Sequence, residues 1–139
     1  MILEVQELIN EYTKWLKDKT TLRQVEDWIE ITTPFLDRHN DHLQIFAKKV
    51  TDEKYLLTDD GYIINDLQTS GCNLDTAKRE ELLQITLNGF GVKLEGQALT
   101  VTAAPQNFST RKHSLIQAML AVNDMFYLAT PIVKSLFLE

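Results

Sequence analysis

Ionisable side chains are concentrated in two short segments of the chain. The first segment contains Asp37, Arg38, His39, Asp41 and His42. The second contains Asp59 and Asp60, within the sequence Thr58-Asp-Asp-Gly61. Carboxylates and imidazoles gathered in loops can bind a divalent cation or supply a base near a metal-bound water. Two other interpretations are open: a loop that binds a partner protein, and plain turns, in which Asp and Asn are common because their side chains bond to nearby backbone.

The spacing of these residues matches no closed metal motif. A nuclease of the restriction-enzyme type would place an Asp on one strand and an acid-x-Lys sequence on the next. Here the candidate second strand reads Gln44-Ile-Phe-Ala-Lys48, with no acid two residues before the lysine. The chain also lacks a glycine-rich phosphate loop, a Gly-x-Ser-x-Gly elbow and a His-Glu-x-x-His helix. We therefore expect no catalytic residues, no metal and no cofactor.

Composition limits the range of functions. The chain has 139 residues, which fits one domain, and carries a formal net charge of -6. This balance argues against a surface built to bind nucleic acid and is compatible with a basic partner or simply with solubility. The single cysteine, Cys72, suits a reducing cytoplasm. No apolar run approaches the roughly 18 residues that span a bilayer, so we expect no membrane interaction.

Hydrophobic periodicity predicts the elements that position the two segments. We expect helices over 2–18, 75–88 and 109–129, a sheet core over 25–66 and a strand hairpin over 91–103, within a single domain of residues 1–139. Residues 62–64 read as a fourth short strand or as the start of a single helical turn, and 132–138 as a short apolar tail. The predicted fold is α+β. It is a two-layer sandwich with an antiparallel or mixed sheet of five to six strands and three helices, in the order α-β-β-β(-β)-α-β-β-α.

One segment resembles a known family. The run from Ile31 to Leu43 contains Thr-Pro-Phe and a following Asp, and Leu57-Thr-Asp-Asp-Gly-Tyr62 lies downstream. These segments resemble the sequence signature of the bacterial domain-of-unknown-function family 1828. The segments at 87–92 and 115–126 also resemble sequences of that family. The resemblance covers about residues 25–130. It implies a place in bacteria and their mobile elements and suggests a phage-linked role. The order of elements is also similar to that of type III secretion chaperones, which are homodimers that bind extended segments of other proteins.

We predict a small acidic cytoplasmic protein-binding module without catalytic activity. The partner-binding residues would be Asp37, Arg38, His39, Asp41, Asp59 and Asp60. If a phage encodes the chain, a host-defence nuclease is a plausible target, as for anti-CRISPR or anti-restriction inhibitors, and direct nucleic-acid binding is not expected. One alternative is a metal-dependent nuclease or phosphodiesterase that uses the loop carboxylates. Another is a chaperone-like homodimer, because the first and last helices carry broad apolar stripes.

Overall fold

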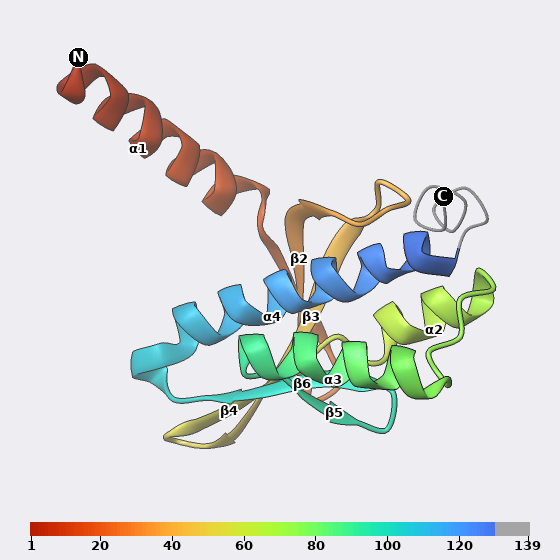
Figure 1. The fold of residues 1–139 in the computed structure, drawn as a ribbon. Coiled ribbons are helices and arrows are strands. Elements are labelled where there is room, and N and C mark those ends of the chain that lie inside the picture. The colour runs from red at the N-terminus through yellow and green to blue at the C-terminus, as the bar shows by residue number, and fades with distance from the viewer. Residues whose placement is uncertain (130–139) are drawn as a thin grey trace.

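The computed structural model describes residues 1–129, so the predicted tail at 132–138 lies outside the described residues. Figure 1 shows the order of the elements along the chain. The helices are α1 (Ile2–Lys19), α2 (Tyr62–Thr69), α3 (Ala77–Phe90) and α4 (Phe108–Asn123), with 3₁₀ turns η1 (Pro105–Asn107) and η2 (Asp124–Ala129). The strands are β1 (Thr21–Val25), β2 (Trp28–Leu36), β3 (His42–Thr51), β4 (Lys54–Thr58), β5 (Lys93–Glu95) and β6 (Ala98–Ala103).

The six strands form one sheet in the order β1-β2-β3-β4-β6-β5, and every neighbouring pair is antiparallel. Strands β1 to β4 follow one another through hairpins. The chain then passes through α2 and α3, enters the far edge as β5 and returns as β6 beside β4. The predicted α+β class with an antiparallel sheet is confirmed.

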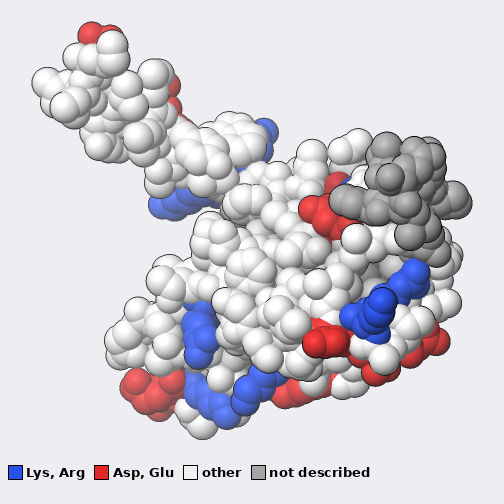
Figure 2. All heavy atoms as spheres, in the orientation of Figure 1, with Lys and Arg blue, Asp and Glu red and all other residues white. Residues whose placement is uncertain are grey.

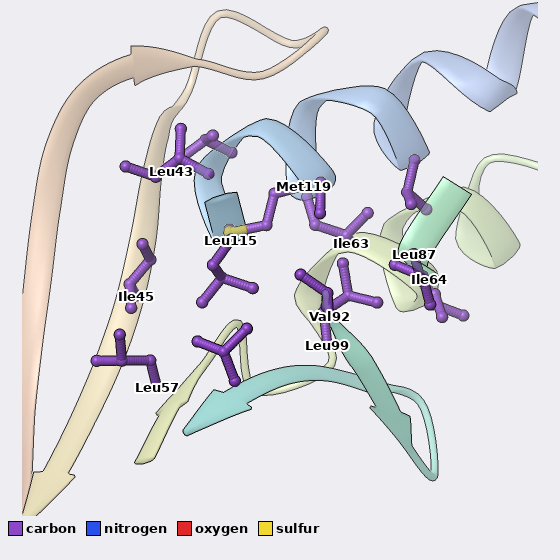
Figure 3. Packing of buried hydrophobic residues seen from close by; sticks show 14 of the residues in the cluster. Leu43, Ile45, Leu57, Ile63, Ile64, Leu87, Val92, Leu99, Leu115 and Met119 are labelled. Atoms are coloured by element: carbon purple, nitrogen blue, oxygen red, sulfur yellow. The ribbon is translucent and has the colours of Figure 1, made fainter. Parts of the chain in front are cut away.

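The core lies between one face of the sheet and helices α2, α3 and α4. Side chains alternate across a strand, so Leu43, Ile45 and Ala47 of β3 all face this core. Leu57 and Leu99 of the neighbouring strands and Leu115 and Met119 of α4 complete its centre, and Figure 3 shows these side chains converging. The remaining members of β3, among them Gln44 and Phe46, point to the opposite face.

The prediction of three helices is wrong, because residues 1–129 alone contain four α-helices. Residues 62–69 form two turns of helix α2 where a short strand or a single turn was expected. A buried carboxylate, that of Asp59, accepts a hydrogen bond from the Ile63 N–H in the first turn of this helix. The third predicted helix also ends early, since α4 stops at Asn123 and the chain continues as η2.

Strand β1 was not expected either, because the sheet was predicted to begin at residue 25. It is an edge strand, and all of its residues except Val25 are exposed. A strand exposed on both faces has no apolar alternation to recognise. Glu26 then adopts a positive φ of 56° in the tight turn to β2.

Helix α1 projects away from the rest of the molecule (Figure 1), and none of its residues is buried. Among residues 1–129, no helix is both long enough and apolar enough to cross a membrane.

Candidate functional site

Part of each ionisable segment lines one open cleft of about 680 Å³: Asp41 and His42 from the first segment, and Asp59 and Asp60 from the second. Strand β4 ends at Thr58, which is paired with Phe46 of β3. The chain then turns beside the first residues of β3, from His42 to Ile45, which β4 does not pair with. This turn brings the end of β4 close to the loop between β2 and β3. The cleft is lined by Thr32, Asp41, His42, Gln44, Phe46, Asp59, Asp60, Gly61, Tyr62 and Asn65.

Asp59 is fully buried and holds the turn between β4 and α2. Its Oδ1 accepts hydrogen bonds from the N–H groups of Gly61 and Leu99, both at 2.9 Å, and its Oδ2 accepts one from Ile63 at 3.1 Å. Burial raises the pKa of the Asp59 carboxyl, and the backbone N–H groups act in the opposite direction. Asp59 therefore connects β4, α2 and β6 from inside the fold and does not present its charge to a partner.

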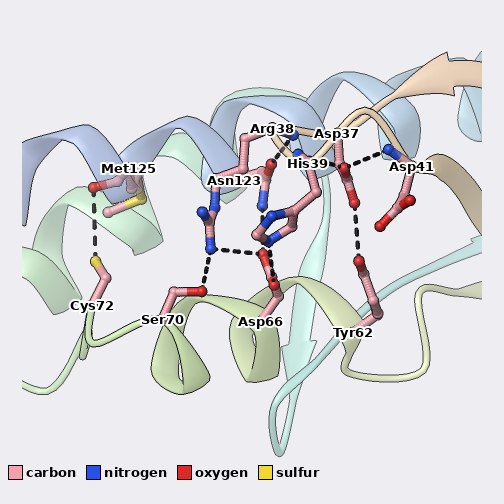
Figure 4. A network of polar contacts seen from close by, with 10 residues as sticks. All are labelled: Asp37, Arg38, His39, Asp41, Tyr62, Asp66, Ser70, Cys72, Asn123 and Met125. Atoms are coloured by element: carbon pink, nitrogen blue, oxygen red, sulfur yellow. Dashed lines mark hydrogen bonds and ion pairs between the residues drawn. The ribbon is translucent and has the colours of Figure 1, made fainter.

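Asp37 has a similar role in the loop between β2 and β3, and it is 5% exposed. Its Oδ1 accepts hydrogen bonds from the N–H groups of His39, at 2.8 Å, and Asp41, at 3.0 Å. Its Oδ2 accepts one from the Tyr62 hydroxyl at 3.0 Å, which attaches this loop to α2 (Figure 4). Burial, followed by the hydrogen bond to Asp37, raises the pKa of Tyr62 to about 12.

Arg38 is held in an ion pair whose members are both largely buried. Its Nη2 lies 3.2 Å from Oδ2 of Asp66, and it also donates to the Ser70 hydroxyl (Figure 4). The guanidinium lies 4.0 Å from the centre of the Phe126 ring, within the range of a cation–π contact. The charge of Arg38 is thus used to join the loop to α2 and η2.

His39 and Asn123 complete this network around Asp66. The Nε2 of His39 lies 2.8 Å from Asp66 Oδ1, and the Asn123 amide donates to Asp66 Oδ2 at 3.3 Å. The side-chain oxygen of Asn123, Oδ1, accepts a hydrogen bond from the backbone N–H of Arg38 at 2.9 Å. Our sequence reasoning missed both Asp66 and Asn123. The i, i+4 spacing of Asp66 and Ser70 would have placed them on one helix face, had α2 been recognised at its full length.

Of the six predicted binding residues, only Asp41 and Asp60 expose carboxylates in the cleft. Within residues 1–129, neither carboxylate has a hydrogen-bonding or ion-pairing partner. His42 is also exposed there, and its Nδ1 donates to the Thr33 carbonyl at 2.9 Å, which leaves Nε2 for a ligand. Rings of Phe46 and Tyr62 line the same cleft. Two free carboxylates beside two aromatic rings suit a cationic side chain with an aliphatic stem.

The carboxylates do not gather as metal ligands. Across the described residues 1–129, no group of three or more His, Cys, Asp or Glu side chains is placed to hold a metal ion.

Comparison with known families identifies the chain at family level. The family model described as domain of unknown function DUF1828 matches residues 33–122. The chain belongs to this family. The resemblance seen in the sequence is thereby confirmed. The matched range contains the whole cleft except Thr32, and it contains neither α1 nor β1. No curated protein and no solved structure matches the chain.

Proposed function

We propose that this protein is a non-catalytic binding module whose cleft holds a cationic segment of a partner protein. The observation that carries the proposal is the placement of Asp41 and Asp60. They lie in two different loops at the open end of the β3–β4 hairpin, they line one cleft, and both carboxylates are exposed without a partner among the described residues. Exposed acids on a rigid frame provide the charge complementarity that directs association with a basic surface.

The size and lining of the cleft indicate what fits. Its volume of about 680 Å³ lies within the range typical of small-ligand sites, so it accommodates a few side chains and not a whole domain. An Arg or Lys side chain can contact Phe46 and Tyr62 with its stem or its charge while the head group pairs with a carboxylate. The net charge of -6 favours approach of a basic partner over distances of about a Debye length.

The partner that we propose is a nucleic-acid-binding enzyme, such as a host-defence nuclease inhibited by a phage-encoded protein. Such enzymes expose Lys and Arg along the groove that receives phosphates. The acidic cleft would occupy part of that groove. The free, buried thiol of Cys72 supports a reducing compartment such as the cytoplasm for this encounter.

The hydrogen bonds of Asp37 and Asp59 favour this function over the nuclease alternative. Each of these carboxylates accepts three hydrogen bonds from the protein itself. A metal-dependent nuclease would need the carboxylates of Asp37, Asp41, Asp59 and Asp60 to coordinate a shared cation. Those of Asp37 and Asp59 are instead occupied by hydrogen bonds within the protein.

We also propose that the working form is a homodimer. Helix α1 exposes large apolar side chains from one end to the other, among them Leu3, Leu8 and Trp15. Exposed apolar surface of this extent usually marks an interface. The molar mass in solution tests this part of the proposal independently of the cleft, and a mass of one chain at micromolar concentration would contradict it.

The cleft is tested with a fluorescent peptide that alternates arginine with apolar residues, followed by anisotropy. We expect the double variant Asp41→Asn/Asp60→Asn to bind about tenfold more weakly, which corresponds to about 1.4 kcal/mol for two solvent-exposed charge pairs. The matched control is Asp52→Asn/Glu53→Gln. It removes the same two charges at the exposed turn between β3 and β4 and should bind as the wild type does.

Equal weakening in both double variants would show that only net charge matters, and the cleft would then have no special role. No binding of the peptide by wild type would also reject the proposal. Affinity capture from a bacterial lysate with wild type and with Asp41→Asn/Asp60→Asn, at low and high salt, then identifies proteins retained only by the intact cleft.

A further inference from the structure

Helix α1 presents an apolar stripe that no other part of residues 1–129 covers. Val5, Leu8, Tyr12 and Trp15 recur at alternating intervals of three and four residues, which is the spacing of a helix that packs along its length. Leu8 is 62% exposed and Trp15 is 47% exposed. Figure 2 shows α1 standing clear of the body, with few charged atoms on the side in view.

The body carries an apolar groove beside the base of this helix. The groove has a volume of about 430 Å³, and Leu22, Ile29, Ile31, Tyr55 and Phe108 are among the residues that line it. It lies on the core face of the sheet, where Phe108 at the start of α4 meets β1 and β2. Leu22 is 69% exposed although it lies on this face. The groove continues into a second hollow of about 840 Å³, which reaches Leu16 of α1. We call these two hollows together the Leu22 groove.

The α1 helix of the same chain is poorly placed to fill the Leu22 groove. Only Thr20 separates α1 from β1, and two consecutive Cα–Cα steps span less than about 8 Å. A helix laid over a sheet needs its axis about 10 Å from the neighbouring layer. Thr20 is extended, its hydroxyl donates to the Leu16 carbonyl, and its N–H donates to the Lys17 carbonyl. This closed helix end directs α1 away from its own sheet.

The first half of α1 is acidic, whereas the charged side chains that line the Leu22 groove are mainly basic. The first half of α1 carries Glu4, Glu7 and Glu11 and has no Lys or Arg before Lys14. The groove carries Lys112 and Lys49, with Asp27 as the one acid in its lining, and Lys49 also forms an exposed ion pair with Asp52 at 3.2 Å. The second hollow adds His113, beside Lys17 from the C-terminal half of the chain's own α1. Lys112 is half-buried, and among residues 1–129 no acid lies within salt-bridge distance of it. Burial lowers the pKa of Lys112, so a carboxylate brought to this position would be favourably paired.

We propose that α1 of one copy packs into the Leu22 groove of a second copy, and that the second copy does the same in return. The exchange is two-fold symmetric, so both apolar surfaces are covered in a closed dimer and no open filament forms. The acidic half of each helix lies beside the lysines of the other copy. This inference rests on the proposed homodimer and specifies which surfaces form it.

The first test uses the molar mass measured by light scattering after size-exclusion chromatography. Wild type should have a mass of about 32 kDa, twice the 16.0 kDa of one chain. Leu8→Glu places a charge in the apolar stripe and should reduce the mass to one chain. Asn10→Glu adds the same charge on the opposite side of α1 and should leave the dimer intact. A dimer that survives Leu8→Glu would overturn the proposal.

Two charge-reversed variants test where α1 binds. Variant A carries Glu4→Lys and Glu11→Lys on the helix, and variant B carries Lys49→Glu and Lys112→Glu in the groove. Each alone opposes like charges in its own dimer and should be monomeric. In a mixture, the helix of A meets the groove of B and the helix of B meets the groove of A, so a heterodimer should form.

The outcomes separate this inference from the proposed dimer. A monomeric wild type refutes both. A dimeric wild type with a dimeric variant B refutes the exchange alone, because direct pairing of two α1 helices does not involve Lys49 or Lys112. A mixture of A and B that stays monomeric also counts against the exchange. Circular dichroism of A and B checks that both variants fold.

Discussion

Replacing Asp59 with asparagine changes one carboxylate oxygen into an amide nitrogen and keeps the size of the side chain. The retained oxygen can still accept hydrogen bonds from Gly61 and Leu99. The new amide group would face the Ile63 N–H, which now donates to Asp59 Oδ2 at 3.1 Å. A backbone N–H cannot act as an acceptor, so two donors would point at each other inside the protein.

The expected cost follows from three contributions. Losing a hydrogen bond to a charged acceptor costs about 1.5–3 kcal/mol, and a buried donor without a partner costs a further 1–3 kcal/mol or so. Burial raises the pKa of Asp59, which means that the carboxylate's desolvation opposes these bonds and is relieved in the variant. We therefore take the low end of the range and expect Asp59→Asn to lose about 2 kcal/mol of unfolding free energy.

The same amide substitution at two other aspartates provides matched controls. Asp60 is exposed, and asparagine tolerates its positive φ of 58°, so Asp60→Asn should stay within about 0.5 kcal/mol of wild type. Asp37 Oδ2 accepts from the Tyr62 hydroxyl, which can rotate and accept a bond from the new amide. Asp37→Asn should therefore lose less than Asp59→Asn, at most about 1 kcal/mol.

Urea unfolding followed by far-ultraviolet circular dichroism measures all three variants. With a slope of about 2 kcal/mol per molar urea, the midpoint of Asp59→Asn should fall by about 1 M. If Asp59→Asn unfolds at the same urea concentration as Asp60→Asn, then the three hydrogen bonds to Asp59 do not stabilise the protein by more than the desolvation of its carboxylate costs. The role of Asp59 in holding the cleft would then be refuted.

Three further predictions concern the network, the cleft and the core. Arg38→Ala leaves the largely buried Asp66 carboxylate with only His39 and Asn123 as partners among residues 1–129, so it should cost about 3 kcal/mol in urea unfolding, the low end of the range for breaking a buried pair. Arg23→Ala, at an exposed ion pair, should cost less than about 1 kcal/mol. The Tyr62 hydroxyl should titrate near pH 12, measured as the difference between the ultraviolet titrations of wild type and Tyr62→Phe. Because its pKa is raised in the folded state, the stability it adds is complete below about pH 10 and is lost as the pH rises through about 12. Leu57→Ala, at a fully buried position, should lower the unfolding free energy by about 2–5 kcal/mol, and Leu94→Ala, at a position that is 37% exposed, by much less.

Local patterns predicted most of the fold. The three-and-four spacing from Val5 to Leu16 indicated α1, and the alternation through Leu43 and Ala47 indicated β3. Both patterns exist because one side of each element differs from the other. Strand β1 has no such difference, since four of its five residues are exposed, and it was therefore missed. Helix α2 was underestimated because its stabilising contacts come from Asp59 before it and from Asp37 and Asn123, which are distant in sequence.

The candidate site shows a sharper limit of sequence reasoning. Asp59 and Asp60 are adjacent residues of the same type, and the sequence assigned both to partner binding. Their environments differ because the chain turns through two consecutive positive φ angles, 58° at Asp60 and 80° at Gly61, and directs only the first carboxylate inward. The partner of Arg38 could not be predicted either, since Asp66 lies on another element and only the folded chain brings the two together.

The two loops share one construction, and that construction supports a binding role. In each loop a buried aspartate accepts hydrogen bonds from the backbone at or beside an exposed aspartate: Asp37 from the N–H of Asp41, and Asp59 from the N–H of Gly61 next to Asp60. The Asp60 N–H itself donates a hydrogen bond to the Thr58 hydroxyl. The backbone that carries each free carboxylate is therefore fixed before any ligand arrives, which reduces the entropy lost on binding. One buried aspartate is enough to cap each turn, and in both loops that same aspartate also fixes the backbone of an exposed one. This is the arrangement that the proposed binding of a cationic side chain by Asp41 and Asp60 requires.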